Sequence, residues 1–92
     1  MERLTDNEID ERLSTGLWRR EGEVIVRDLE SADFTAAIAL VNAVAGLAER
    51  ANHHPDILVH GYSHVRLTLT THSVGGLTEA DFELAGAIDA LV

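Results

Sequence analysis

The stretch ANHHPDILVHGYSHVRLTLTTH, residues 51–72, decides the fold because it contains a helix end, two extended segments and the turn between them. In its second half, Val65, Leu67 and Leu69 alternate with polar residues, which is the two-residue period of a strand with one buried face. Gly61 lies between this segment and the β-prone run before it. The stretch therefore predicts a β-hairpin with a core face and a polar face.

Toward the N-terminus, residues 31–52 are rich in alanine and predict a long helix. Pro55 disfavours helical backbone at His54, so we expect this proline to end the helix at the histidine pair. The helix has two apolar stripes, which favours burial on both sides, against the rest of this chain or against another subunit. One stripe contains Phe34, Ile38, Val41, Ala45 and Ala48, and the other contains Leu40, Val44, Leu47 and Ala51.

Three further elements have local signals. Thr5 and Glu8 have the spacing of a capping box, which predicts a short first helix ending at about Ser14. Two β-prone runs flank Glu21-Gly22 and predict another hairpin. After the last glycine pair, Thr78 is followed three residues later by an aspartate, which predicts a capped C-terminal helix.

The predicted order is αββαββα in a single domain over residues 1–92. Two hairpins separated by a helix, without a βαβ pattern, favour an α+β fold: an antiparallel four-stranded sheet with helices packed on one face. A chain of this length buries only about 60% of its unfolded surface. Self-association is therefore a natural way for it to bury more.

Composition excludes several kinds of chemistry. There is no cysteine, hence no thiolate nucleophile, and all seven basic residues are arginine, hence no lysine Schiff base. The net charge of −9 repels phosphate backbones, so we expect no direct nucleic-acid binding. The acidic N-terminus lacks an apolar signal region, and Asn42 and Gly46 interrupt the longest apolar stretch, so we expect no membrane span and a cytoplasmic location.

All five histidines lie in residues 51–72. His53 and His54 follow a helix C-terminus, where the helix dipole and the nearby Glu49 favour imidazolium, whereas burial would oppose it. From the residues alone, three interpretations stay open: solvated histidines that cap free carbonyls, a zinc site with three imidazoles, or a proton-transfer site. No HExxH motif supports zinc, adjacent histidines rarely both reach one ion, and no GxSxG motif supports a serine hydrolase.

Three motifs in order carry a resemblance to a known family. They are NHHPD at residues 52–56, a segment ending LTTH at residues 69–72, and GGLTEADF at residues 75–82. Together they resemble the pterin-4a-carbinolamine dehydratase family, also called 4a-hydroxytetrahydrobiopterin dehydratase. The similarity extends over nearly the whole chain, including LTDNEI at residues 4–9 and Trp18 before the first hairpin.

The resemblance implies a hydro-lyase that dehydrates 4a-hydroxytetrahydrobiopterin to quinonoid dihydropterin and water, in tetrahydrobiopterin biosynthesis and recycling. It also implies a pterin as the small-molecule partner, a homodimer or homotetramer, and no metal or organic cofactor. His53, His54 and His72 match the three active-site histidines of the family. We expect His53 and His54 to share the acid and base roles, while His72 binds the pterin near its reacting edge.

The resemblance further implies four supporting residues. Glu49, one turn before the histidine pair, is expected to orient His53. Pro55 is expected to fix the geometry of the pair, and Asn52 stands where an acidic residue can precede it. Asp81 follows the glycine-rich loop and is either a helix cap or a site residue.

A second function belongs to a different class. Some members of the family bind a transcription factor or are implicated in enzyme assembly, so a non-catalytic dimerisation factor or transcriptional cofactor is the alternative. The stripe with Leu40, Val44 and Leu47 is the surface we expect for such contacts.

Overall fold

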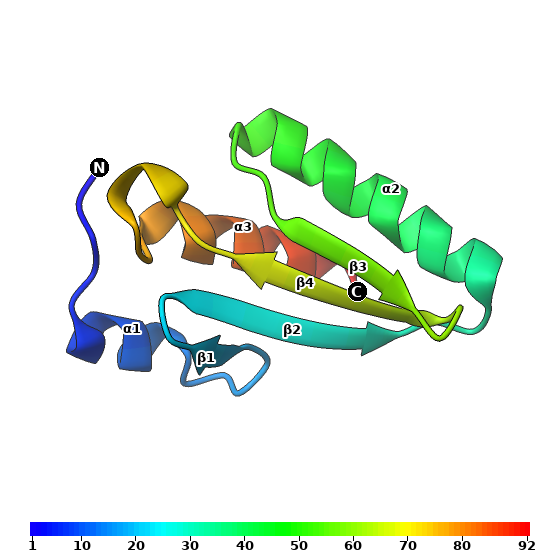
Figure 1. Ribbon diagram of the computed structural model, residues 1–92, viewed down its shortest axis with the longest axis horizontal. Helices are drawn as coiled ribbons and strands as arrows, with labels where there is room; N and C mark the ends of the chain where they lie inside the picture. The colour runs from blue at the N-terminus through cyan, green and yellow to red at the C-terminus, as the bar shows by residue number, and fades with distance from the viewer.

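The computed structural model describes all 92 residues and confirms the predicted α+β fold (Figure 1). The sheet is antiparallel throughout, with strand order β1-β2-β4-β3. A short 3-10 helix, η1, between β4 and α3 adds one element to the predicted order. The elements are α1 (Asp6–Arg12), β1 (Arg19–Glu21), β2 (Val24–Glu30), α2 (Phe34–Ala51), β3 (Asp56–His60), β4 (His64–Leu69), η1 (His72–Val74) and α3 (Glu79–Leu91).

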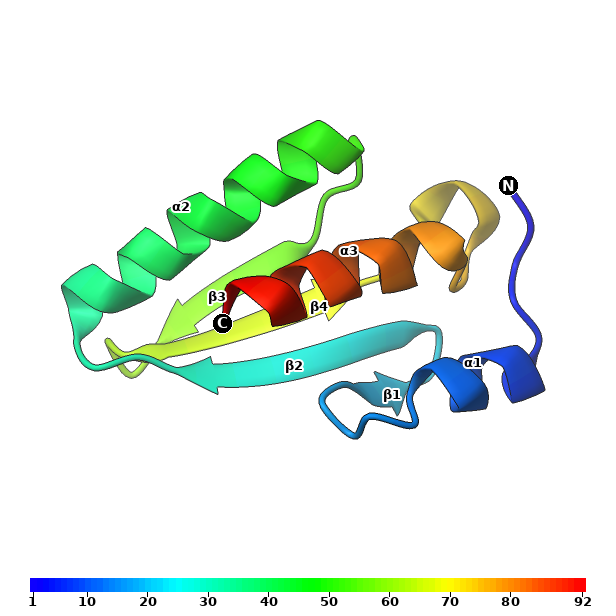
Figure 2. The same ribbon diagram turned by 180° about the vertical axis from the view of Figure 1, so that it is seen from behind.

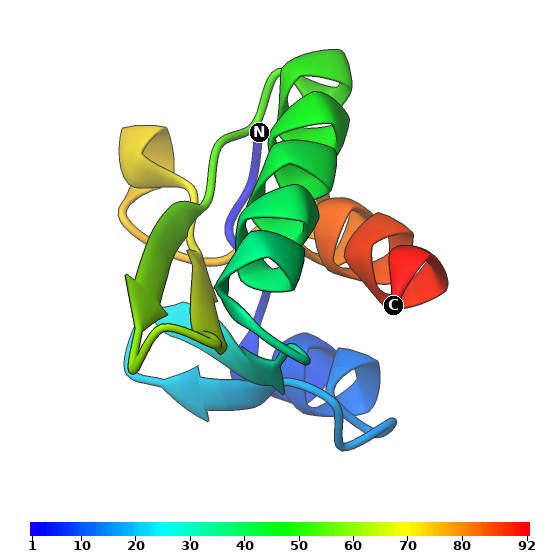
Figure 3. The same ribbon diagram turned by 90° about the vertical axis from the view of Figure 1, so that its right-hand side faces the viewer.

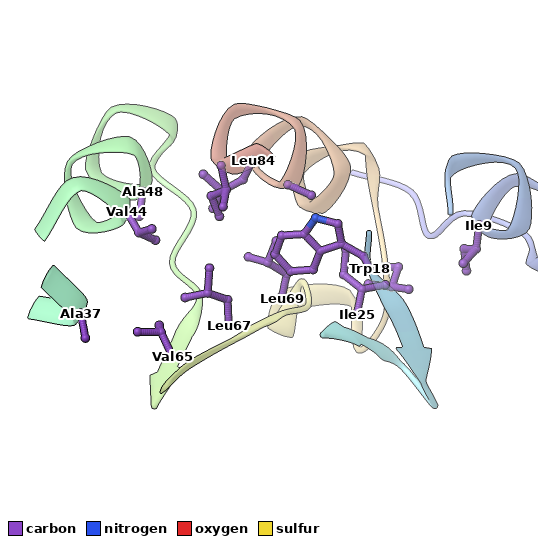
Figure 4. Close-up of a cluster of buried hydrophobic side chains, with 13 residues drawn as sticks. Ile9, Trp18, Ile25, Ala37, Val44, Ala48, Val65, Leu67, Leu69 and Leu84 are labelled. Atoms are coloured by element: carbon purple, nitrogen blue, oxygen red, sulfur yellow. The ribbon is translucent and has the colours of Figure 1, made fainter. Parts of the chain in front are cut away.

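Helices α2 and α3 cover one face of the sheet, and the other face is open (Figures 2 and 3). The alternation predicted for β4 is confirmed, because the side chains of Val65, Leu67 and Leu69 are fully buried. They point toward the helices, where Val44 of α2 and Leu84 of α3 complete the core (Figure 4). Most of the core therefore lies in a single layer between the sheet and the two long helices, and Ile9 of α1 extends it at one end.

The predicted helix starts are confirmed at α1 and α3. At α1, the Thr5 hydroxyl accepts from the Glu8 backbone N–H at 3.2 Å, and the Glu8 carboxylate accepts from the Thr5 N–H at 2.9 Å. At α3, Thr78 and Asp81 form the second capping box. Helix α1 ends at Arg12, two residues before the predicted end, with its cap at Leu13.

The end of α2 differs from the prediction that Pro55 terminates it. The helix ends at Ala51, because Asn52 adopts the left-handed conformation with φ 49° and ψ 43°. The Asn52 N–H still bonds back to the helix carbonyls of Ala48 and Glu49. Asparagine tolerates this conformation better than most residues, so it acts as the C-cap, and Pro55 restricts only the segment that follows.

The residues that α2 buries do not follow either of the two predicted apolar stripes, so this part of the prediction is wrong. The buried line contains Ala37, Val44 and Ala48. Ala48 belongs to the first predicted stripe, Val44 to the second, and Ala37 to neither. By contrast, Phe34 and Ile38 are 54% and 36% exposed. In a helix this rich in alanine, many positions are apolar, so periodicity alone could not choose which line faces the sheet.

The surface predicted for self-association is corrected for the same reason. Val44 is fully buried in the chain's own core, and Leu40 and Leu47 pack against that core. The large apolar side chains that α2 leaves exposed are instead Phe34 and Ile38.

Helix α2 is the one helix whose length and composition reach those of a membrane span, with mean hydropathy 1.3 over 18 residues. The core helix of a compact domain meets the same criteria. Here Ala37, Val44 and Ala48 hold α2 on the sheet.

The open face of the sheet carries a network of charged side chains across three strands. Asp28 accepts hydrogen bonds from Arg66 Nε at 2.7 Å and from Arg19 Nη1 at 2.8 Å. These bonds, first that from Arg66 and then that from Arg19, lower the pKa of Asp28 from 3.8 to about 2. Because the pKa of Asp28 is lower in the folded protein, the network stabilises the fold at pH values above the unfolded pKa of 3.8. This stabilisation is lost as the pH falls through the folded pKa of about 2.

We predict that carboxyl NMR titration gives Asp28 a pKa of about 2, and that Arg66→Gln raises it toward 3.8. Arg3→Gln serves as the control, because Arg3 pairs with Glu23 and not with Asp28. A pKa of Asp28 that stays the same in both variants would contradict the network.

Candidate active site

The last turn of α2 and the left-handed cap aim His53 at the start of α3. The His53 backbone N–H bonds to the Ala48 carbonyl at 3.1 Å, which fixes the residue against the helix end. Its side chain is 14% exposed, and Nε2 lies 2.6 Å from Oδ1 of Asp81. His53 is thus a largely buried imidazole held by a carboxylate from another helix.

Asp81 is fully buried and uses both carboxylate oxygens. Oδ1 meets His53, while Oδ2 accepts from the Thr78 backbone N–H at 2.9 Å and from the Thr71 hydroxyl at 2.8 Å. Since an ionised carboxylate can only accept, His53 Nε2 is the donor in its contact. Asp81 is therefore both the cap of α3 and the hydrogen-bond partner of His53.

Glu49 contacts His54, so the expectation that it orients His53 is wrong. Glu49 Oε2 lies 2.5 Å from His54 Nε2, and these side chains are 75% and 59% exposed. The left-handed turn at Asn52 explains the change of partner, because it directs His53 toward α3 and leaves the next residue beside the α2 terminus. This second histidine–carboxylate pair is open to solvent.

His72 was predicted to close strand β4, but it begins η1 instead and is exposed. Strand β4 ends at Leu69 because the chain then turns, and Thr71 pairs with Gly76 across the loop. No hydrogen bond joins the His72 ring to the other candidates. The loop nevertheless lies at the same end of the molecule as the α2 terminus (Figures 1 and 2), and Thr71, directly before His72, contacts the Asp81 that holds His53.

A cavity of about 320 Å³ lies beside His53, between the C-terminal part of α2 and α3. Its polar lining comes from His53, Arg50 and Glu83, and its apolar lining includes Leu47 and Leu84. A volume near 300 Å³ is at the lower limit for small-ligand pockets. Of the three candidate histidines, only His53 lines this cavity.

The two histidines that are not candidates, His60 and His64, lie away from this site. His60 and His64 stack at the end of the β3–β4 hairpin, with ring centroids 5.3 Å apart. No group of three histidine, aspartate or glutamate side chains is placed to hold a metal ion.

Thr71 is not among the candidate residues that the sequence motifs indicate. A signal for it exists, because Thr71 continues the odd-numbered register of Val65, Leu67 and Leu69 on the core face. A polar residue at a buried position of a strand pattern needs a hydrogen-bond partner, and here the partner is Asp81.

The fold and the site define a small α+β domain with a histidine–aspartate pair where two helices meet the end of a sheet. The family model described as pterin 4 alpha carbinolamine dehydratase matches residues 2–91. The chain therefore belongs to the pterin-4-alpha-carbinolamine dehydratase family, as the motifs predicted.

Relatives match along their full length. The chain is 52% identical over 93 residues to a protein of Acidobacterium capsulatum, covering 100% of both chains. It is 54% identical over 93 residues to a protein of Chloroflexus aurantiacus, covering 100% of this chain and 99% of the relative. Both relatives bear the name pterin-4-alpha-carbinolamine dehydratase as a provisional assignment.

Two solved structures share the fold. A protein from Brucella melitensis described as a transcriptional coactivator/pterin dehydratase has TM-score 0.90 and 34% identity, covering 98% of each chain. A pterin dehydratase-like protein identified as a RuBisCO assembly factor in the alpha-carboxysome has TM-score 0.67 and 28% identity, covering 80% of this chain and 87% of that one. The fold thus occurs in relatives described both as dehydratases and as factors that act on other proteins.

Proposed function

We propose that the protein dehydrates 4a-hydroxytetrahydrobiopterin, a pterin-4a-carbinolamine, to quinonoid dihydropterin and water by histidine acid–base catalysis. The observation that carries this proposal is the contact between His53 Nε2 and the buried Asp81 carboxylate, at 2.6 Å, in the wall of a ligand-sized cavity. A purely structural histidine at a helix end needs neither a buried carboxylate partner nor access to a cavity.

The reaction needs two proton transfers. A proton must reach the 4a-hydroxyl as the C4a–O bond breaks and water leaves, and the N5 proton must be removed as the C4a–N5 double bond forms. Imidazoles suit both steps, because they accept and release protons near neutral pH. No electrons are transferred to or from the pterin, so no oxidant or reductant is required.

Geometry suggests the roles of the first two histidines. Because His53 Nε2–H donates to Asp81, the nitrogen left for the substrate is Nδ1, whose lone pair can accept the N5 proton. His54, beside the exposed carboxylate of Glu49, then acts as the acid toward the 4a-hydroxyl. The two roles exchange for a substrate of the opposite configuration at C4a.

The other residues that the sequence identified have supporting roles in the proposal. His72, in the loop beside Thr71, binds the pterin near its reacting edge and assists proton transfer. Asn52 and Pro55 hold the histidine pair from either side, Asn52 through its left-handed cap and Pro55 through its fixed φ. The reaction serves tetrahydrobiopterin recycling in the cytoplasm, without a metal or organic cofactor.

A non-catalytic assembly or coactivator role is the second candidate. The exposure of Phe34 and Ile38 on α2 favours it, because these large apolar side chains lie four residues apart on one helix face and together form an exposed apolar surface that suits contacts between proteins. The same face suits a homodimer or homotetramer. Light scattering that finds a monomer at micromolar concentration would contradict self-association.

We predict that His53→Gln and His54→Gln each lower kcat by roughly 10²–10⁴-fold, because each removes one proton-transfer group. His72→Gln is expected to raise KM as well, because it removes a contact to the pterin. The measurement is the rate at which enzymatically generated 4a-hydroxytetrahydropterin disappears.

His60→Gln and His64→Gln are the matched controls, since these rings lie at the far hairpin and are expected to leave the rate unchanged. Wild-type protein that gives no acceleration over buffer would sink the dehydratase proposal and leave the assembly role.

A further inference from the structure

Thr71 is a buried threonine whose hydroxyl lies at the centre of a short chain of hydrogen bonds. Its side chain is held 2.8 Å from Asp81 Oδ2 and 2.8 Å from the Thr78 hydroxyl. Since the single hydrogen of the Thr71 hydroxyl goes to Asp81, Thr71 can only accept from the Thr78 hydroxyl, whose own hydrogen also has Met1 Sδ as an acceptor at 2.9 Å. With Thr71 6% exposed and Thr78 and Asp81 fully buried, water cannot readily replace these bonds.

The main chain of Thr71 fixes the loop that carries His72. Its N–H donates to the Gly76 carbonyl at 3.0 Å, and its carbonyl accepts from Val74 at 3.2 Å and from Gly76 at 3.4 Å. The loop closes on Thr71 from both sides, with His72 as its first residue. The position of His72 therefore depends on the backbone of Thr71.

We propose that Thr71 is a positioning residue that couples His53 to His72. Its hydroxyl holds the Asp81 carboxylate, which orients His53, and its backbone holds the loop that presents His72. The inference rests on the proposed function, because it assigns both imidazoles to one reaction. Thr71 itself does not touch the reacting atoms.

The expected consequence of losing the hydroxyl follows from the contacts. In Thr71→Val, Asp81 Oδ2 keeps only the Thr78 backbone N–H, so the carboxylate can rotate and His53 loses its fixed orientation. Valine has nearly the shape of threonine, so the core around it keeps its volume. Small misplacements of a catalytic group cost up to about 10²-fold in rate.

The kinetic test compares three variants with wild type. Thr71→Val is expected to lower kcat about 10–100-fold with KM changed by less than about threefold, because the pterin contacts stay. Thr71→Ser, which keeps the hydroxyl, is expected to recover most of kcat. Thr70→Val is the matched control: Thr70 is the neighbouring threonine, and its hydroxyl donates to the Glu23 carbonyl at 2.7 Å, away from Asp81.

A second readout does not depend on activity. Imidazole ¹⁵N NMR of the ligand-free protein is expected to show changed His53 ring shifts in Thr71→Val and wild-type shifts in Thr71→Ser and Thr70→Val. If Thr71→Val matches Thr70→Val in both kcat and the His53 shifts, Thr71 has no positioning role. The proposed dehydratase function still stands in that case if the wild-type protein is active. An inactive wild type whose His53 shifts still respond to Thr71→Val overturns the catalytic role of the coupling and the proposed function together.

Discussion

The site depends on one buried carboxylate. Asp81 has no exposed surface, and burying such a group is costly unless its oxygens are hydrogen-bonded. Its three partners come from three parts of the chain: the segment after β4, the start of α3 and the residue after the α2 cap. Each partner segment is therefore held in place by the need to satisfy the same group.

The position of Asp81 in α3 explains how one residue can serve both the fold and the site. The third residue of a capped helix turns its side chain back toward the helix start, where Thr78 needs an acceptor for its N–H. One oxygen meets that need together with Thr71, and the second is left to face His53. A capping box thus becomes the support of a candidate catalytic imidazole, beside a cavity between α2 and α3.

Much of the fold could be predicted from the sequence because its signals are local. The alternation in β4 and the capping boxes at Thr5 and Thr78 depend on residues a few positions apart. The face of α2 could not be predicted, since alanine is compatible with either side. The partner of Glu49 depended on the left-handed backbone at Asn52, and asparagine permits that conformation without requiring it. The motifs identified His53, His54 and His72 as candidates, but the link through Thr71 required the register of β4 together with the position of α3.

The most direct measurement compares how much Asp81→Ala and Asp33→Ala each lower the free energy of unfolding, determined by urea denaturation. Asp33 caps α2 through one bond, to the Ala36 N–H at 2.8 Å, and its loss is expected to cost about 0.5–2 kcal/mol. Asp81→Ala leaves buried donors from three segments without an acceptor and is expected to cost roughly 2–4 kcal/mol, more than Asp33→Ala. A cost for Asp81→Ala no larger than that for Asp33→Ala would contradict the dependence of the site on this carboxylate.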